Sequence, residues 1–168
     1  MAKLGDKTDF SYRVKRVTKV VDGDTIDVIL DMGFDILFAQ RVRLFGIDTP
    51  ESRTRDKVEK IYGLKSKKFL QEKLKKAKKI TIKTYKNSET GKFGRILGDV
   101  WCDGKSVNSE MVKVGHAVAY YGQNKKLVEA AHLRNRKRVW WIYFLQYLLN
   151  LDYLLPLLWL WVGSSILF

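Results

Sequence analysis

Residues 40–51 read Gln-Arg-Val-Arg-Leu-Phe-Gly-Ile-Asp-Thr-Pro-Glu, a stretch that begins like a strand and ends like a turn. The branched and aromatic side chains of residues 36–47 favour a β-strand, whose alternation places Arg41, Arg43 and Phe45 on one face. Proline has no N–H for a strand ladder and pushes its predecessor into an extended or turn conformation, so the strand is predicted to break at the Asp-Thr-Pro step. Two guanidinium groups should therefore point in the same direction just before a turn.

The turn adds two carboxylates to the two arginines. Asp48 stands at the predicted strand end, and Glu51 lies just past the break. Because guanidinium groups bind phosphate oxygens and clustered carboxylates bind hard cations, this set is suited to holding a metal ion beside a phosphate. Taken in isolation, the same residues also suit an ordinary solvated strand and turn.

The charge of the chain is strongly positive and unevenly distributed. The 168 residues, a length that suits one domain with its own core, include 32 Lys and Arg against 18 Asp and Glu, a formal net charge of +14. Every Lys and Arg lies at or before Arg138. Such an excess favours a polyanionic partner, either nucleic acid or an acidic membrane surface.

Residues 139–168 form an apolar C-terminal tail that carries a single charge, Asp152. The tail is long enough to span a bilayer, and it follows a basic run of the kind found on the cytoplasmic side of membrane helices. The sequence thus divides into a basic domain, residues 1–138, and a tail, residues 139–168, that is expected to act as a membrane segment. An altered reading frame or a decayed terminus accounts for the tail almost equally well.

Two further features concern the cellular compartment. Cys102 is the only cysteine, so no internal disulfide is possible and an oxidising compartment is not required. Residues 1–20 have no apolar run and contain Asp6 and Asp9, so we expect no signal peptide. The basic domain is therefore expected in the cytoplasm, with membrane association only through the tail.

The first half of the basic domain predicts three strands and a helix. Residues 12–21 and 25–30 alternate like strands around an Asp-Gly-Asp turn, and residues 31–35 form a second turn before the arginine strand. Residues 58–77 then change to helical periodicity, with lysines on the outer face. The expected inner face consists of Val58, Ile61, Tyr62, Phe69, Leu70, Leu74 and Ala77.

The second half adds two strands and two helices. Strands are predicted over residues 79–85 and 93–102, a short helix over residues 106–114 ending at Gly115, and a basic helix over residues 127–138. This order predicts an α+β fold, a five-stranded β-barrel of the OB type with about three helices and the apolar tail. Helices packed on an open sheet are the alternative.

Several separated motifs of the basic domain resemble those of the staphylococcal nuclease (thermonuclease) family. Val-Val-Asp-Gly-Asp-Thr at residues 20–25 is similar to the family's V-[IV]-D-G-D-T, and Arg43 with Asp-Thr-Pro-Glu at residues 48–51 is similar to its R-L-x-x-x-D-T-P-E. Further matches are Lys-Phe-Gly-Arg at residues 92–95, Asp-Gly-Lys-Ser-Val-Asn at residues 103–108 and His-Leu-Arg at residues 132–134. So many motifs in the family's order make the resemblance specific.

The resemblance implies a calcium-dependent endonuclease that hydrolyses DNA and RNA, leaves 3′-phosphate ends and acts as a monomer. The implied Ca²⁺ ligands are Asp24, Asp48 and the carbonyl oxygen of Thr49. The implied catalytic residues are Arg43 and Arg95, on the reacting phosphate, and Glu51, the general base. The implied substrate contacts are Lys92 and the ring of Tyr120 or Tyr121, although the two tyrosines can equally be packing residues at the barrel edge.

The chemistry of these residues agrees with the resemblance. Asp24, Asp48 and Glu51 offer only oxygen ligands, which favour a hard cation. Arginine spans two phosphate oxygens at once and keeps its charge at any working pH. The main alternative is a binding module that holds single strands in a basic groove without chemistry. Catalysis is favoured because all five critical positions have the required residue type. These positions are Asp24, Arg43, Asp48, Glu51 and Arg95.

Other residues keep two interpretations at this stage. Asp22 and Asp27 either assist the site or are bystanders in the turn and strand. His116 and His132 are expected to be structural or solvated rather than catalytic. Residues 25–43 are about five residues longer than in the staphylococcal prototype that the chain resembles, which predicts a larger second turn near the site.

Overall fold

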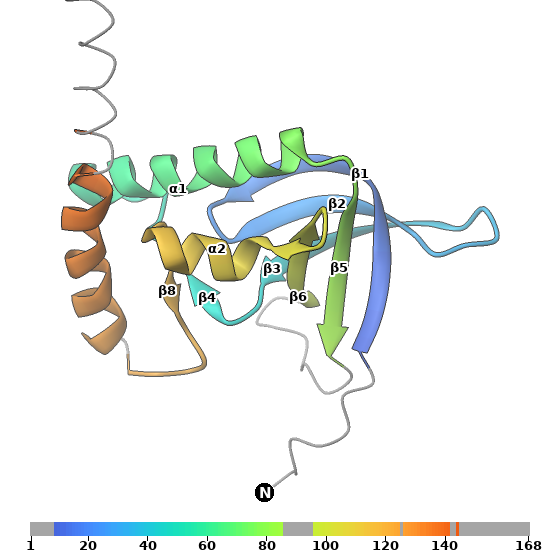
Figure 1. The fold of residues 1–168 in the computed structure, drawn as a ribbon. Helices are drawn as coiled ribbons and strands as arrows, with labels where there is room; N and C mark the ends of the chain where they lie inside the picture. The colour runs from blue at the N-terminus through green and yellow to red at the C-terminus, as the bar shows by residue number, and fades with distance from the viewer. Residues whose placement is uncertain (1–8, 86–95, 125, 142–143, 145–168) are drawn as a thin grey trace, which may run out of the picture.

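The computed structural model describes residues 9–85, 96–124, 126–141 and 144. Within them, five long strands form a closed β-barrel (Figure 1). They are β1 (Asp9–Asp22), β2 (Thr25–Asp31), β3 (Leu37–Leu44), β5 (Ile80–Tyr85) and β6 (Ile96–Cys102). Neighbours in the order β3-β2-β1-β5-β6 pair antiparallel, and a parallel pairing of β3 with β6 closes the barrel. The predicted α+β fold with a five-stranded barrel is confirmed.

The arginine strand ends earlier than predicted. β3 stops at Leu44, and Gly46 follows with a φ of 73° before the short strand β4 (Ile47–Asp48). Glycine adopts this backbone conformation without steric cost, so the chain turns there and not at the Asp-Thr-Pro step. β4 pairs with β8 (Val118–Ala119) in a separate two-stranded sheet. The early turn brings Asp48 back beside Arg43.

The hairpin of β2 and β3 carries its extra length away from the candidate site. Its pairing begins with Thr25 opposite Arg43 and ends with Asp31 opposite Leu37. Since strand residues advance by about 3.3 Å each, the turn at residues 32–36 lies roughly 20 Å beyond the Thr25 end. The expectation of a larger turn near the site is therefore wrong. The hairpin instead projects from the barrel (Figure 1).

Apolar side chains from all five strands fill the barrel interior. The buried barrel residues include Val14, Ile26, Val28, Leu30, Val42, Leu44, Ile82 and Val100. Leu70 of the first helix and Met111 of the second belong to the same cluster. Where β3 meets β6 there is room only for a glycine, because a Cβ on Gly98 would approach Cγ2 of Ile82 to 2.6 Å.

Helix α1 (Lys57–Lys76) crosses one side of the barrel, and its inner face differs from the prediction. The buried residues are Gly63, Ser66, Leu70 and Leu74. Val58 and Ile61, which were expected inside, are about half exposed, so this part of the prediction is wrong. The reason is close backbone packing at Gly63, where an added Cβ would lie 2.5 Å from the carbonyl oxygen of Glu51. Small residues therefore take the inner positions of the first turns.

The remaining helices agree with the sequence. Ser106, in the short strand β7 (Lys105–Ser106), caps α2 (Val107–Val114), and Gly115 ends that helix in the left-handed conformation, with a φ of 87°. A further helix over residues 126–141 covers the predicted 127–138 and extends to the buried Val139. No helix among the described residues is both long and apolar enough to cross a bilayer. Residues 93–95, the start of the predicted strand 93–102, and most of the tail lie outside the described residues.

His116, just after α2, is a buried titratable residue that packs against α1. Its ring packs on Phe69 with 4.6 Å between ring centroids, and its carbonyl oxygen accepts the hydroxyl of Ser66 at 2.7 Å. Burial lowers the pKa of His116 to about 4, and the charge of Lys65 acts in the same direction.

We expect the free energy of unfolding to fall as the pH drops from about 6.5 to 4. The unfolded chain, in which a histidine pKa is about 6.5, binds a proton in this range that folded His116 does not accept, so acid favours unfolding. Urea denaturation at a series of pH values should show a smaller decline for His116→Gln than for the wild type. Since the acidic residues are common to both proteins, parallel declines would contradict this role.

Candidate active site

Arg43 lies between two aspartates that come from different parts of the chain. Its Nη1 is 2.7 Å from Oδ2 of Asp24, in the turn between β1 and β2, and its Nη2 is 3.0 Å from Oδ1 of Asp48, in β4. The N–H of Leu44 donates to the carbonyl oxygen of Asp24 at 2.8 Å and holds that turn against β3. A guanidinium has several N–H donors in a fixed plane, so one arginine can bridge both carboxylates.

Asp24 is buried in this bridge, and its charge is only partly compensated. Burial raises the pKa of Asp24, and the charges of Asp48 and Asp22 raise it further. The Arg43 guanidinium and the Thr25 hydroxyl lower it. The net direction is upward. The charges of three carboxylates, those of Asp22, Asp24 and Asp48, act here against one guanidinium, which favours the approach of a further cation.

The loop that carries Glu51 is tied to the barrel by Asp22. Oδ1 of Asp22 accepts the N–H of Gly23 at 2.8 Å and the N–H of Ser52 at 3.3 Å. On its other side the loop backbone packs directly against Gly63 of α1. Asp22 thus supports the Glu51 loop through its hydrogen bonds.

Glu51 itself is solvent-exposed but surrounded by other acids. Partial burial raises its pKa, and the charges of Asp22, Asp24 and Asp48 raise it further. A carboxylate with a raised pKa is a stronger base towards water. The electrostatics of the pocket therefore suit Glu51 to accept a proton.

These groups surround a pocket of about 260 Å³ at the open end of the β2–β3 hairpin. Its lining residues are Val21, Asp22, Asp24, Thr25, Arg41, Arg43, Glu51 and Arg53. Arg41 and Arg43 both reach it, as the strand alternation predicts. Arg41 is held by Asp27, with Nε at 2.6 Å and Nη2 at 2.8 Å from the two carboxylate oxygens. Asp27 is thus the partner of Arg41 and does not line the pocket.

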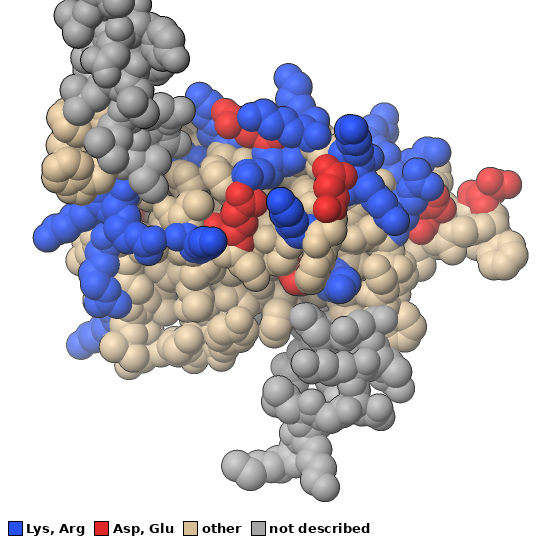
Figure 2. Space-filling view, in the orientation of Figure 1, with Lys and Arg blue, Asp and Glu red and all other residues tan. Residues whose placement is uncertain are grey.

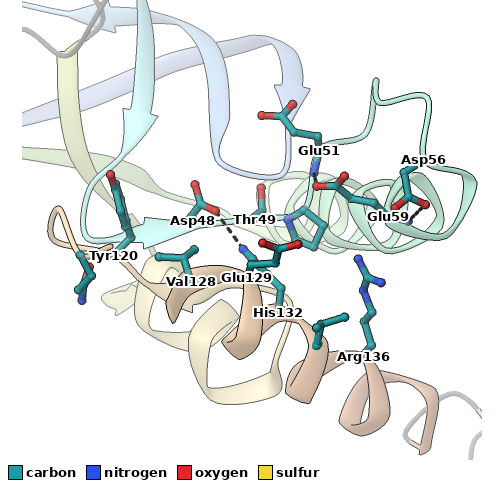
Figure 3. Close-up of a pocket in the computed structure, with 13 residues that line it drawn as sticks. Asp48, Thr49, Glu51, Asp56, Glu59, Tyr120, Val128, Glu129, His132 and Arg136 are labelled. Atoms are coloured by element: carbon teal, nitrogen blue, oxygen red, sulfur yellow. Dashed lines mark hydrogen bonds and ion pairs between the residues drawn. The ribbon is translucent and has the colours of Figure 1, made fainter. Parts of the chain in front are cut away.

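His132 is a neighbour of the site that the sequence did not predict. Its Nε2 lies 2.9 Å from Oδ2 of Asp48, and the contact joins helix 126–141 to β4 (Figure 3). Asp48 is therefore held from both sides, by Arg43 on one oxygen and by His132 on the other. No local pattern could reveal this pair, because the two residues are 84 positions apart in the chain.

The predicted substrate contacts are only partly described. Tyr121 is 71% exposed, with its ring edge-on to Phe45 at 5.9 Å between ring centroids, so it is not a core residue. Tyr120 lines a second cavity, of about 630 Å³, which also includes Asp48 and Glu51 (Figure 3). Lys92 and Arg95, predicted to contact substrate and phosphate, lie outside the described residues.

Asp24 and Asp48 fit a hard divalent cation by their donor chemistry. Both offer carboxylate oxygens, and an oxygen that accepts one hydrogen bond keeps a second lone pair. Among the residues that the structure describes, no three His, Cys, Asp or Glu side chains converge closely enough to hold an ion by themselves. The resemblance assigns the third protein ligand to the carbonyl oxygen of Thr49.

Comparison with known proteins places the chain in a family. The family described as staphylococcal nuclease homologue matches residues 41–139, more than half of the chain, and this range includes Arg43, Asp48 and Glu51. The chain belongs to the staphylococcal nuclease homologue family. The matched range begins at β3 and ends at the buried Val139, so the family resemblance extends through helix 126–141.

Individual relatives of this staphylococcal nuclease homologue are similar over most of its length. It is 35% identical over 132 residues to a thermonuclease of Staphylococcus intermedius, which covers 76% of this chain and 73% of the relative. It is 35% identical over 117 residues to endonuclease YncB of Bacillus subtilis, covering 68% of this chain and 53% of the relative. An uncharacterized endonuclease of Escherichia coli is 36% identical over 110 residues, 65% of this chain and 62% of the relative. These similarities support a nuclease activity.

We expect Gly63→Ala to lower both stability and activity. A methyl group at Gly63 would clash with the backbone of Glu51, so α1 and the loop would have to separate. Overpacking of this kind costs about 1–3 kcal/mol, although alanine alone would favour a helix by about 1 kcal/mol. Urea denaturation and a hydrolysis assay measure the two effects, with Gln71→Ala, at an exposed position of the same helix, as the control. A Gly63→Ala protein as stable as the wild type would show that the contact is loose.

We expect His132→Ala to lower the free energy of unfolding by about 1–2 kcal/mol. The substitution leaves Oδ2 of Asp48 without its partner and detaches helix 126–141 from β4. Chemical denaturation measures the change. Arg134→Ala, at an exposed position of the same helix, should stay within about 0.5 kcal/mol of the wild type. Equal effects of the two variants would mean that the Asp48 contact contributes nothing.

Proposed function

We propose that this chain is a calcium-dependent endonuclease that hydrolyses phosphodiester bonds of DNA and RNA and leaves 3′-phosphate ends. The observation that carries the proposal is the Arg43 guanidinium bound to both Asp24 and Asp48 at the pocket that contains Glu51. A cation, two carboxylates that could bind a metal ion and a third carboxylate that could act as a general base would thus be adjacent, as phosphodiester hydrolysis requires. The similarity to a thermonuclease and to endonucleases supports the same activity.

Arg43 would bind the reacting phosphate while staying attached to the aspartates. A guanidinium has five N–H donors, and its contacts with Asp24 and Asp48 need only two of them. The remaining donors can bind phosphate oxygens and stabilise the negative charge that develops on them. Because both aspartates fix the guanidinium in advance, little reorganisation is needed when the substrate binds.

Glu51 would act as the general base. Its carboxylate takes a proton from the attacking water, whose oxygen forms a bond to phosphorus while the bond from phosphorus to the 5′ oxygen breaks. The 5′ oxygen leaves with a proton from solvent, and the phosphate stays on the 3′ side. Asp24, Asp48 and the carbonyl of Thr49 would hold Ca²⁺, which supplies positive charge to the phosphate in the transition state.

The substrate would bind to a surface rich in basic and aromatic side chains. The active protein would be a monomer. Arg41 and Arg53 line the pocket beside Arg43 and provide further positive charge for the neighbouring phosphates. The exposed ring of Tyr121 suits stacking on a base, which is tolerant of sequence. Lys92, Tyr120 and Arg95 complete the set of residues that we propose to contact the substrate.

Arg43→Lys and Glu51→Gln should each lower turnover about a hundredfold or more, while Arg55→Lys, at an exposed position of the adjacent loop, should not. The first two remove contacts that matter in the transition state, and loss of one such group typically costs about 3–4 kcal/mol. The measurement is hydrolysis of labelled DNA and RNA with Ca²⁺ and with a chelator, with thermal unfolding as the check on folding.

The same assay separates this proposal from its alternative. Binding of single strands without cleavage in Ca²⁺ would identify a nucleic-acid-binding module. Cleavage that persists in chelator would disprove the calcium requirement alone. Cleavage by Glu51→Gln at the wild-type rate would remove the general-base assignment and leave the remaining roles intact.

A further inference from the structure

The first half of α1 exposes an apolar surface that the core does not use. Val58, Ile61 and Leu64 are 52%, 53% and 48% exposed, on the side of the helix away from the buried Gly63 and Ser66. A helix packed on a barrel normally turns polar side chains to the solvent. This part of α1 presents three large aliphatic side chains there instead.

Helix 126–141 carries a second apolar group beside the first half of α1. The guanidinium of Arg136 lies 5.6 Å from the ring centroid of Tyr62, so the two helices are neighbours (Figure 1). Trp140 follows one turn after Arg136 and therefore lies on the same face of its helix. It packs against Trp141 and Phe144, with ring centroids 5.6 Å and 5.0 Å away, and all three rings stay at least one-third exposed.

We call these six residues the apolar face: Val58, Ile61, Leu64, Trp140, Trp141 and Phe144. Lysines and arginines neighbour these residues in the sequence of both helices. They are Lys57, Lys60, Lys65, Lys67 and Lys68 in α1, and Arg134, Lys137 and Arg138 in helix 126–141. Figure 2 shows Lys and Arg side chains along the side of the molecule where α1 lies. Between residues 57 and 68 there is one acid, Glu59, whose carboxylate accepts the N–H of Glu51 and so turns towards the loop.

The sequence that follows Phe144 is also apolar. Residues 145–168 lie outside the described residues, but their sequence contains no Lys or Arg and one acid, Asp152. The residues that follow Phe144 in the sequence are thus as apolar as the apolar face itself. A partner that accepts apolar side chains suits both.

We propose that the apolar face and its neighbouring cations are a docking surface for an anionic lipid bilayer. Aliphatic side chains would enter the boundary between headgroups and acyl chains, and tryptophan rings favour that depth. Lysine stems can lie along the apolar surface while their ammonium groups meet lipid phosphates. Apolar insertion and electrostatic attraction together provide the two signals that stable membrane binding needs.

A nucleic acid suits this surface less well. Its phosphates would pair with the lysines, but Val58, Ile61 and Leu64 offer nothing to a phosphate backbone. Bases stack on open aromatic faces, whereas Trp140 and Phe144 already stack on each other, with 8° between ring planes. The proposal is independent of the nuclease function, because it uses none of the residues of the active-site pocket.

The test is a fluorescent label on the full-length chain. An environment-sensitive dye is attached at Leu64→Cys in a Cys102→Ser background, with Ser109→Cys, exposed on α2 beside Phe45, as the matched control site. Vesicles of equal parts phosphatidylglycerol and phosphatidylcholine should shift the emission of the dye at position 64 to the blue and leave the dye at position 109 unchanged. A vesicle-bound protein whose dye at position 64 remains in water would overturn the proposal.

A second measurement uses variants matched in charge. Ile61→Glu with Leu64→Glu should weaken binding to the same vesicles at least about tenfold, since two inserted side chains are lost. Gln71→Glu with Ser109→Glu also adds two negative charges but removes no apolar surface, and should bind nearly as well as the wild type. Equal binding by both double variants would overturn the proposal. The proposal would also be overturned if the dye at position 64 responded to single-stranded DNA but not to vesicles. It would be overturned likewise if the dye responded to rising protein concentration without vesicles, which would indicate contact between copies of the chain.

Discussion

The bridge from Asp24 through Arg43 to Asp48 is the interaction on which the candidate site depends. It joins three pieces of chain, namely the β1–β2 turn, β3 and β4, and it holds two like charges near each other by placing one cation between them. The bridge can form only because the chain turns at Gly46, after β3 has ended and before Asp48. The barrel fixes the arginine, and the turn then supplies the second carboxylate.

The site is acidic within a protein that is strongly basic. Asp22 and Asp48 are close enough to raise the pKa of both Asp24 and Glu51, whereas the chain as a whole carries a net charge of +14. The long-range field therefore attracts a polyanion, and the local field attracts a cation. In the proposed function, this division of charge would bring a phosphate and a metal ion to the same place.

The motifs and periodicities predicted the barrel, the helices and the group of Asp24, Arg43 and Asp48, because each depends on local spacing or on recognisable sequence. Three features depend on contacts that spacing does not encode. The close approach of Gly63 to the Glu51 loop rotates α1 and exposes Ile61, whereas periodicity alone placed that side chain inside. His132 reaches Asp48 from a distant helix, and the β2–β3 hairpin carries its extra residues away from the pocket.

The parallel pairing of β3 with β6 also constrains how the chain folds. Val42 is opposite Ile96, and between them in sequence lie the Glu51 loop, α1 and β5. The β1–β2–β3 meander can form from near neighbours, but the last seam of the barrel must wait until this long segment has been ordered, because non-local contacts cost loop entropy before they gain energy. Ile82 and Val42 meet at this seam beside Gly98. Closure of the barrel should accordingly be a late event in folding, and Arg43, on the strand at the seam, acquires its final surroundings only then.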